Sequence, residues 1–307
     1  MAGSGFGTNF RITTWGETHG AGVGVVVDGC PAGLPLERED VQKYLDRRKP
    51  GQSKYTTQRK EGDQVEILSG IFEGRTTGTP ISMVVYNKDQ RSKDYSNIKD
   101  IYRPGHADFT FDMKYGFRDY RGGGRSSGRE TIGRVAAGAV AAKVLKELGI
   151  EIKAYAKAIA GIEVSKDHFD FAEMNNNPFN MPDKEAAKLV QEKADQMIKE
   201  MDSIGGIIEC QIKGMPVGIG ETVFDKLDAE LSKAIMSIGS VKGFEIGDGF
   251  EAANLRGSEN NDDFICVDGK VEKETNHSGG VLGGMSDGST IVFRAAIKPT
   301  PSIAQTQ

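Results

Sequence analysis

Glycine is the feature that most constrains what this chain can fold into. Of its 307 residues, 40 are glycine, and they follow no collagen-like repeat. Because glycine lacks a Cβ, it supplies the tight turns and close backbone approaches that other residues disfavour. Charged residues make up 27% of the chain and hydrophobic residues 37%, a balance typical of a folded protein and not of a disordered one. The sequence therefore predicts a globular protein in which many tight turns join the elements.

The chain alternates between strand-like and helix-like segments. Apolar, β-branched runs predict strands over residues 24–29, 65–72, 81–86, 150–162, 204–212, 241–246 and 289–298. Apolar periodicity predicts helices over residues 38–48, 130–148, 183–201 and 225–237, with Asp225 as the N-cap of the last. Residues 87–128 show little periodicity, which indicates an irregular, functional segment. The mixture predicts an α+β fold, and because no Pro/Ser-rich linker interrupts it, we expect a single domain over residues 1–307.

Several classes of protein are disfavoured by the sequence. No apolar run reaches the roughly 18–20 residues that a membrane-spanning helix needs, and the first 20 residues lack the pattern of a signal peptide. Cys30, Cys210 and Cys266 lie far apart and show no metal-ligand spacing. We therefore expect a cytoplasmic protein with no membrane partner and no metal.

The charges are unevenly distributed along the chain. Residues 1–134 hold 21 Lys and Arg against 17 Asp and Glu, whereas the remainder holds 18 against 27. The overall net charge of −5 disfavours nucleic acid as a partner. A local excess of cations in an acidic protein instead favours a binding site for a small anion.

A glycine- and arginine-rich segment is the strongest candidate for that site. Five arginines fall within seventeen residues, interleaved with Gly122–Gly124 and Ser126-Ser127: Arg118, Arg121, Arg125, Arg129 and Arg134. Guanidinium groups bind phosphate and carboxylate through paired hydrogen bonds, and the following helix adds the positive end of its dipole. The alternative is a solvated charged loop. The segment matches neither a Walker loop nor a dinucleotide-binding fingerprint.

Two of the four histidines lie in glycine-rich loops. His19 lies in the sequence GETHG and His106 in RPGHAD. Because imidazole titrates near neutral pH, both are candidates for proton transfer; the alternative is an ordinary hydrogen-bonded loop histidine. His168 lies in a polar run, which indicates a surface residue. The sequence leaves the role of His277 open.

These same segments resemble chorismate synthases. The blocks follow the order of that family and span nearly the whole chain: GETHGAGVGVVVDGCP, DRRKPGQSKYTTQRKEGD, DQRSKDYS, RPGHADFTFDMKYGFRDYRGGGRSSGRET, GSVKGFEIGDGF, NHSGGVLGGMSDG and KPTPSI. The resemblance implies a lyase that converts 5-enolpyruvylshikimate 3-phosphate to chorismate by 1,4-elimination of phosphate, the last common step of the shikimate pathway to the aromatic amino acids. It also implies a homotetramer, helices sandwiched between antiparallel sheets, and a requirement for reduced FMN without net redox change.

The resemblance also implies roles for individual residues. His19, beside the hydroxyl of Thr18, would protonate the departing phosphate, and His106 would protonate or hydrogen-bond the flavin near N1. Arg48, Arg129 and Arg134 would bind the substrate. The FMN-lining set would comprise Arg125, Ser126, Ser127, Gly239, Ser240, Gly283, Lys298, Pro299, Thr300, Pro301 and Ser302.

Two departures from the family pattern limit what the resemblance implies. An NADPH contact at Arg48 and Lys54 stays open, because Lys54 stands where the family usually has arginine. NADPH would serve only as an external reductant. The family's C-terminal Arg-His-Asp-Pro segment is not part of the sequence, so we expect residues 1–307 alone to fold but to catalyse poorly.

Three other functions compete with this interpretation. A flavin oxidoreductase would use the same pocket for net hydride transfer. A protein that only binds a phosphorylated metabolite would not need two loop histidines. An RNA-binding function is disfavoured by the acidic total charge and by the lack of any RNA-binding module.

Overall fold

The computed structural model describes residues 3–56, 61–88 and 99–307. The block DQRSKDYS (residues 89–96) lies outside this range. The chain divides into two compact units, Met1–Glu147 with Gln307, and Leu148–Thr306. Each unit contains its own five-stranded antiparallel sheet.

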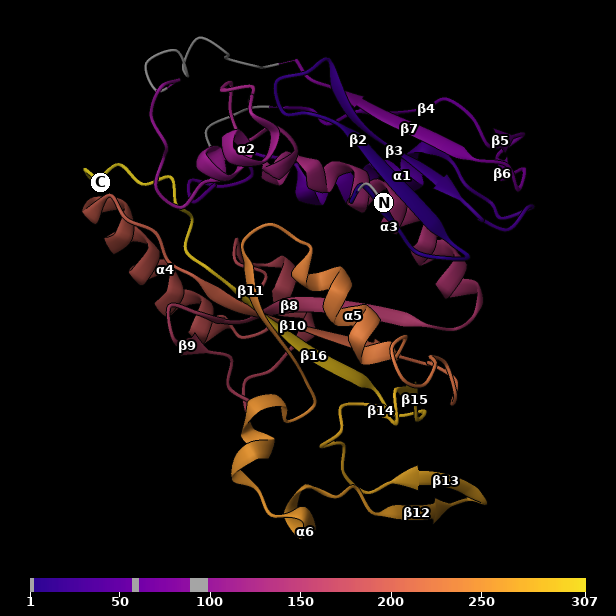
Figure 1. The fold of residues 1–307 in the computed structure, drawn as a ribbon. Helices are drawn as coiled ribbons and strands as arrows, with labels where there is room; N and C mark the ends of the chain where they lie inside the picture. Colours follow the sequence, from indigo (N-terminus) through magenta and orange to yellow (C-terminus); the bar gives the residue numbers. More distant parts are fainter. Residues whose placement is uncertain (1–2, 57–60, 89–98) are drawn as a thin grey trace. The chain divides into compact units, whose positions relative to one another are not determined.

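The first unit is a sheet covered by helices (Figure 1). Its strand order is β1-β2-β3-β7-β4, and β5 and β6 form a separate hairpin. The strands are β1 (Gly5–Phe6), β2 (Arg11–Gly16), β3 (Gly22–Asp28), β4 (Val65–Ile67), β5 (Ile71–Phe72), β6 (Arg75–Thr76) and β7 (Ile81–Tyr86). The helices are α1 (Arg38–Arg48), α2 (Asp108–Tyr115) and α3 (Thr131–Glu147).

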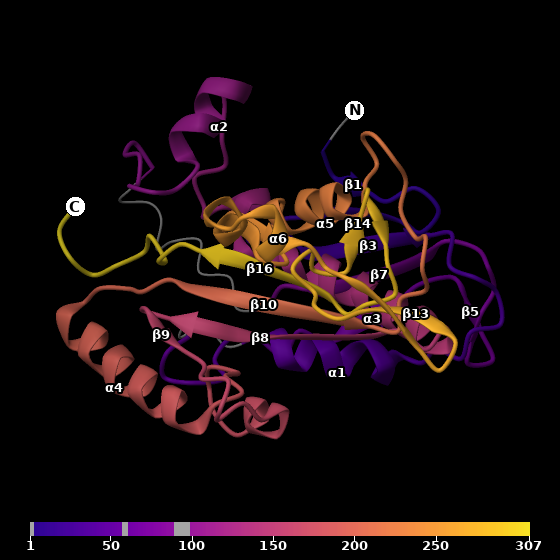
Figure 2. The same cartoon turned by 90° about the horizontal axis from the view of Figure 1, so that it is seen from below.

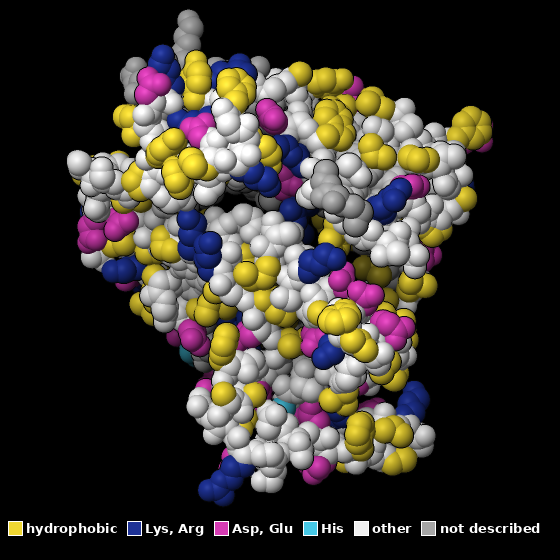
Figure 3. All heavy atoms as spheres, in the orientation of Figure 1, with side chains coloured by type: hydrophobic (Ala, Val, Ile, Leu, Met, Phe, Trp, Pro, Cys, Tyr) yellow, Lys and Arg dark blue, Asp and Glu magenta, His cyan; other side chains and the backbone are white. Residues whose placement is uncertain are grey.

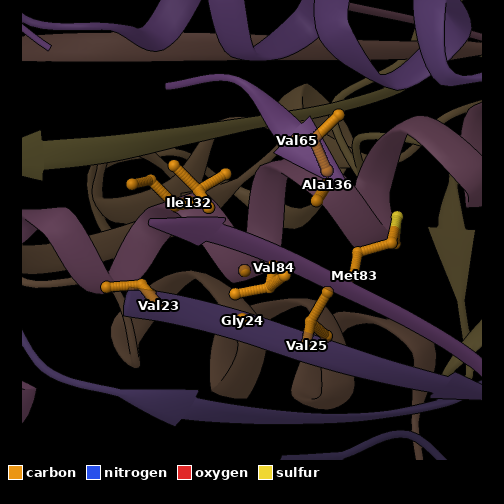
Figure 4. A pocket seen from close by; sticks show the side chains of 10 residues that line it. Val23, Gly24, Val25, Val65, Met83, Val84, Ile132 and Ala136 are labelled. Atoms are coloured by element: carbon orange, nitrogen blue, oxygen red, sulfur yellow. The ribbon is translucent and has the colours of Figure 1, made fainter. Parts of the chain in front are cut away.

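Close packing of α3 on β3 forms the core of this unit. Val23, Val25 and Val27 alternate along β3 and are fully buried in one apolar cluster with residues of α3. A Cβ at Gly133 of α3 would lie 3.0 Å from the Gly24 carbonyl oxygen, so the small residue permits this approach. Figure 4 shows β3, β4, β7 and α3 around a small depression. All ten residues that line it are apolar or glycine. The depression therefore belongs to the core and offers no group that could bind an anion.

The second unit has a sheet of strand order β11-β16-β10-β8-β9. Its strands are β8 (Glu151–Ile159), β9 (Ile162–Glu163), β10 (Gly206–Lys213), β11 (Val241–Ile246) and β16 (Ile291–Ile297). Two small hairpins follow: β12 (Phe264–Val267) with β13 (Lys270–Lys273), and β14 (Val281–Leu282) with β15 (Met285–Ser286). The helices are α4 (Lys184–Glu200), α5 (Leu227–Met236) and α6 (Gly257–Asn260).

Two helices of this unit, α4 and α5, pack at separate places on its sheet. Figure 2 shows α4 beside β9, where Val190 and Met181 are fully buried in a shared apolar cluster. α5 packs near β11. The β12–β13 hairpin presents apolar side chains to solvent, among them Phe264 and Val271. Figure 3 shows a group of apolar side chains at the lower right, where Figure 1 places this hairpin.

Most predicted elements are confirmed, and the errors have local causes. The predicted strand over residues 65–72 is broken into β4 and β5, because Gly70 (φ 82°) turns the chain. The strand predicted over residues 150–162 is likewise two strands, with Ala160 (φ 53°) and Gly161 (φ 79°) in the turn between them. Lys226 rather than Asp225 is the N-cap of α5.

The prediction that residues 87–128 are irregular is wrong for α2. This helix is eight residues long and largely exposed, so it has only Asp108 buried and no apolar stripe that periodicity could detect. Gly116 ends it in the left-handed conformation (φ 69°), as glycine commonly does at a helix C-terminus.

Candidate active site

The glycine–arginine segment lies against β2 in the first unit. It forms two short 3₁₀ turns, Gly124–Ser126 and Gly128–Glu130, directly before α3. The Arg125 guanidinium donates hydrogen bonds to the carbonyls of Thr14 and Gly16, both at 3.1 Å, and to the Thr14 hydroxyl at 2.7 Å. Arg125 therefore anchors the segment to the sheet.

The turn that carries Thr18 and His19 joins β2 to β3 and lies beside this segment. Both side chains are buried, with 7% and 8% of each residue exposed. The Thr18 hydroxyl donates to the Gly124 carbonyl at 3.4 Å, which links the turn to the glycine loop. The hydrogen bond from Arg121 lowers the pKa of the Asp119 carboxyl, and the charge of His19 adds a smaller lowering.

Arg48 and Arg129 meet at one carboxylate. Asp63 is fully buried at its side chain; its Oδ2 accepts from Arg48 Nη1 at 2.6 Å, and its Oδ1 accepts from Arg129 Nη1 at 2.9 Å. Arg48 Nε also donates to the Thr131 hydroxyl at 3.3 Å. A residue of α1 and a residue preceding α3 are thereby held side by side.

Arg129 is the most buried cation of the site, with 5% of the residue exposed. Its Nε donates to Asn87 Oδ1 at 2.6 Å, and its Nη2 lies 3.8 Å from Glu61 Oε2. Among the described residues, this Nη2 is buried and has no hydrogen-bond partner. An unpaired buried donor is costly, and the nearby Glu61 carboxylate offsets part of that cost through its charge.

The other arginines of the segment also have partners among the described residues, and the Thr14 hydroxyl links Arg125 to Glu130, the partner of Arg134. Arg134 Nε donates to Glu130 Oε2 at 2.9 Å. Arg118 lies against carboxylates of α2, and Arg121 binds its neighbour Asp119. The printed contacts join Arg129 to another predicted substrate residue, Arg48, through Asp63.

His106 lies half-buried in the loop before α2. Its Nδ1 lies 2.9 Å from the Pro104 carbonyl oxygen. A carbonyl only accepts, so Nδ1 carries the proton in the neutral ring and the lone pair is at Nε2. Two bonds of 2.8 Å from Arg103 to Asp108 brace this loop, and they lower the pKa of the Asp108 carboxyl.

The predicted flavin residues of the second unit fall into two groups. The Lys298 N–H donates to the Ser240 carbonyl at 3.0 Å, and the Ser203 hydroxyl donates to the Thr300 carbonyl at 2.7 Å. Residues 298–302, which include Pro299, Pro301 and Ser302, therefore begin next to Gly239-Ser240. Gly283 lies instead in the β14–β15 turn, near the opposite end of α5, where Leu227 N–H donates to the Gly284 carbonyl. The ten residues of α5 span about 15 Å.

The remaining candidates have local partners. Lys54 is exposed, with its Nζ 5.0 Å from the centre of the Tyr55 ring. His168 is exposed, and its Nδ1 lies 3.4 Å from Glu185 Oε2. His277 Nδ1 lies 2.7 Å from Asp248 Oδ2, within the second unit.

Sequence reasoning missed Glu61, Asp63 and Asn87, the acceptors around Arg129. Only their positions in loops between strands could have drawn attention to them. Across the described ranges, no group of His, Cys, Asp or Glu is arranged to hold a metal ion. No helix in that part of the chain has the length and apolar character needed to span a membrane.

Comparison with known proteins places this geometry in a family. The family model for chorismate synthase matches residues 10–307. A chorismate synthase from Lachnospira eligens is 70% identical over all 307 residues, which cover 84% of that relative, and one from Methanococcoides burtonii is 58% identical over 309 residues, with 100% of this chain and 84% of that relative covered. A crystal structure of a chorismate synthase superimposes with a TM-score of 0.80 at 33% identity and covers 96% of this chain and 86% of that one, which confirms the α+β class. The chain therefore belongs to the chorismate synthase family, a family of lyases.

Proposed function

We propose that this chain converts 5-enolpyruvylshikimate 3-phosphate to chorismate by 1,4-elimination of phosphate, with reduced FMN bound. The observation that carries the proposal is that the guanidinium groups of Arg48 and Arg129 both bind the Asp63 carboxylate. Asn87 joins this pair directly to the turn that carries His19. A substrate with a phosphate and two carboxylates needs concentrated cations, and its leaving group needs a proton.

Arg48, Arg129 and Arg134 bind the substrate anions in this proposal. Their side chains are 21%, 5% and 32% exposed, so Arg48 and Arg134 are the more accessible to a ligand. Arg129 would contribute the buried Nη2 that has no hydrogen-bond partner among the described residues. A phosphate or carboxylate oxygen there would gain a charge-assisted hydrogen bond.

His19 supplies the proton. In the elimination, the ring C–O bond to phosphate breaks and its electron pair leaves with phosphate. A C–H bond of the ring also breaks: its proton is released to solvent, and its electron pair moves into the ring to form the new double bond. A proton from the His19 imidazolium to the departing oxygen neutralises the charge that develops there. The Thr18 hydroxyl, bound to the Gly124 carbonyl, keeps this turn beside the glycine loop.

The residues present fit a phosphorylated flavin in their chemistry. At Gly124 the backbone is left-handed (φ 50°), and no described atom lies within 4 Å of the position of a Cβ, which leaves the chain open to close approach. Serine hydroxyls, the Lys298 ammonium and glycine backbone are groups that bind phosphate. In the first unit, Ser126 and Ser127 would contact FMN, with Arg125 fixing the loop that carries them. In the second unit, the 298–302 segment is proposed separately as an FMN-binding element.

Reduced FMN, when bound, supplies an electron-rich ring that can lend electron density as the C–O bond breaks. His106 would face it through Nε2, because Nδ1–H donates to the Pro104 carbonyl; Nε2 accepts a hydrogen bond in the neutral ring and carries a proton to donate only in the imidazolium form. The proposal also includes a single domain, a homotetramer and a cytoplasmic location. NADPH would serve as an external reductant, with a contact at Arg48 and Lys54.

The test is the release of chorismate and phosphate in equal amounts under anaerobic conditions with reduced FMN. His19→Ala should lower kcat by about 10²–10⁴-fold. His168→Ala is the matched control, because that histidine is exposed and distant in sequence from the site. Consumption of reductant in step with product would favour the oxidoreductase alternative, and binding without turnover would favour a phosphometabolite-binding protein.

A further inference from the structure

The side chain of Asn87 makes three short hydrogen bonds that join two parts of the candidate active site. Asn87 is the residue that follows β7. Its Nδ2 donates to the carbonyls of Glu17 and Gly20, at 2.9 and 2.8 Å. Its Oδ1 accepts from Arg129 Nε at 2.6 Å.

These contacts enclose the turn that carries His19. Glu17 and Gly20 directly flank Thr18 and His19, so one amide group bonds to both sides of the dipeptide. The Asn87 N–H also donates to the Ala21 carbonyl at 3.0 Å, which fixes the asparagine backbone to the start of β3. The turn cannot shift relative to β7 without breaking these bonds.

The chemistry of the partners fixes the orientation of the amide. The two backbone carbonyls only accept and therefore require the NH₂ group, whereas Arg129 Nε–H only donates and requires the oxygen. An aspartate would retain the bond to Arg129 but would place an oxygen against the two carbonyls. Only an amide satisfies all three partners.

We infer that Asn87 is a positioning residue that holds the His19 turn in register with the Arg129 guanidinium. The inference rests on the proposed roles of His19 as proton donor and of Arg129 as a substrate anchor. A phosphate bound at Arg129 then lies at a fixed distance from the imidazole that protonates it. Displacement of a catalytic group by about 1 Å can cost about 10²-fold in rate.

The variant Asn87→Asp distinguishes the acceptor role of the amide oxygen from the donor role of its NH₂ group. It keeps the acceptor for Arg129 and removes both hydrogen bonds to the His19 turn. We expect kcat to fall by about 10–100-fold. KM should also rise, because the new carboxylate competes with the substrate anions for Arg129, so kcat is the diagnostic quantity. Asp63→Asn, which disturbs Arg48 and Arg129 instead, should mainly raise KM.

Asn177→Asp is a matched control. Its Nδ2 also donates to two backbone carbonyls, of Glu173 at 2.7 Å and Met181 at 2.8 Å, but in the second unit. It should lower thermal stability without selectively lowering kcat. An equal fall in kcat for both variants would show that Asn87 acts only through stability, and would overturn the inference.

A readout without cofactor or substrate completes the test. With only four histidines in the chain, ¹³C-labelled imidazole signals can be followed by NMR. The His19 signal should shift in Asn87→Asp, and in Asn87→Ala if the aspartate variant fails to fold, while the His168 signal stays in place. If the wild type makes no chorismate or His19→Ala retains full activity, the proposed function fails. If the proposed function holds but Asn87→Asp keeps wild-type kcat and an unshifted His19 signal, the inference about Asn87 fails.

Discussion

Asp63 and Glu61 are carboxylates taken almost completely out of water, with side chains 0% and 1% exposed. Burial of a charge costs several kcal/mol unless a counter-charge and hydrogen bonds compensate for it. Arg129 is the residue that contacts both, and Arg48 supplies the second bond to Asp63. Arg48 and Arg129, the arginines proposed to bind the substrate, therefore also stabilise the fold.

Arg129→Ala should lower the free energy of unfolding by about 3–5 kcal/mol, because it removes the cation that two buried carboxylates share, although Asp63 keeps its bond to Arg48. Urea denaturation measures this loss. Arg134→Ala is the control: its ion pair with Glu130 is partly exposed, so its removal should cost about 1 kcal/mol or less while KM for the substrate rises. A loss of stability at Arg134 as large as that at Arg129, with KM unaltered, would assign Arg134 a structural role.

At the scale of elements, the start of α2 depends on an ion pair. Asp108 is the first residue of α2, and Arg103, in the segment before it, binds its carboxylate at two oxygens. This pairing fixes the loop in which His106 lies. The Arg103 hydrogen bonds lower the pKa of Asp108 below the 3.8 of an unperturbed carboxyl.

The lowered pKa gives the stabilisation by this pair a definite pH dependence. The folded state favours the ionised carboxylate, so the stabilisation is complete well above pH 3.8 and is lost as the pH falls through the lower, folded pKa. Asp108→Asn should cost about 1–3 kcal/mol at neutral pH. The difference in unfolding free energy between wild type and variant should stay constant from about pH 8 to 5 and shrink below about pH 4. A difference that grows on acidification would contradict the assignment.

Helix α3 contains two glycines that should respond oppositely to alanine. Gly133→Ala would bring a methyl group 3.0 Å from the Gly24 carbonyl oxygen and the Thr14 side chain, so overpacking should cost about 1–3 kcal/mol. At the exposed Gly138, no described atom lies within 4 Å of a Cβ position, and alanine should stabilise the helix by about 0.5–1 kcal/mol. Thermal denaturation of the two variants measures both effects. Equal losses would show that α3 does not pack on β3 through its Gly133 face.

At the scale of the whole molecule, the reactivity of the cysteine thiols can follow the unfolding of each compact unit separately. Cys30 is buried in the first unit and Cys210 in the second, while Cys266 is exposed. Burial raises the pKa of the Cys30 thiol and raises that of Cys210 to about 12. Because the thiolate is the reactive form, Cys266 should be the only thiol that reacts rapidly with a thiol reagent in the native protein.

Labelling across a urea series then tests the prediction of a single domain. Only residues 148–150 separate the end of α3 from the start of β8, so no flexible linker joins the units. We expect Cys30 and Cys210 to become reactive at the same urea concentration. Two separate midpoints would show that the units unfold as independent domains.

Local pattern was sufficient for much of the fold and for the choice of residues. The bounds of α1, β7 and β11 follow from periodicity and from nearby turn residues, since each element depends mainly on its own few residues. The motifs around His19, His106 and Arg129 placed the chain in its family before any contact was known. Short elements with weak periodicity, such as α2, were missed because local sequence says little about a helix that buries only Asp108.

The sequence alone determined which residue types are available, where most helices and strands form, and which family the chain belongs to. Only the tertiary structure decided which side chains meet. The five arginines that look like one cluster in the sequence are drawn to different partners, whereas Arg129 and Asp63, 66 residues apart, share a buried bond. Asn87 and Arg129, 42 residues apart, are joined in the same way. Such pairs depend on the path of the chain through the sheet. A buried cation needs an acceptor to offset its desolvation, and the fold can bring that acceptor from any position in the sequence.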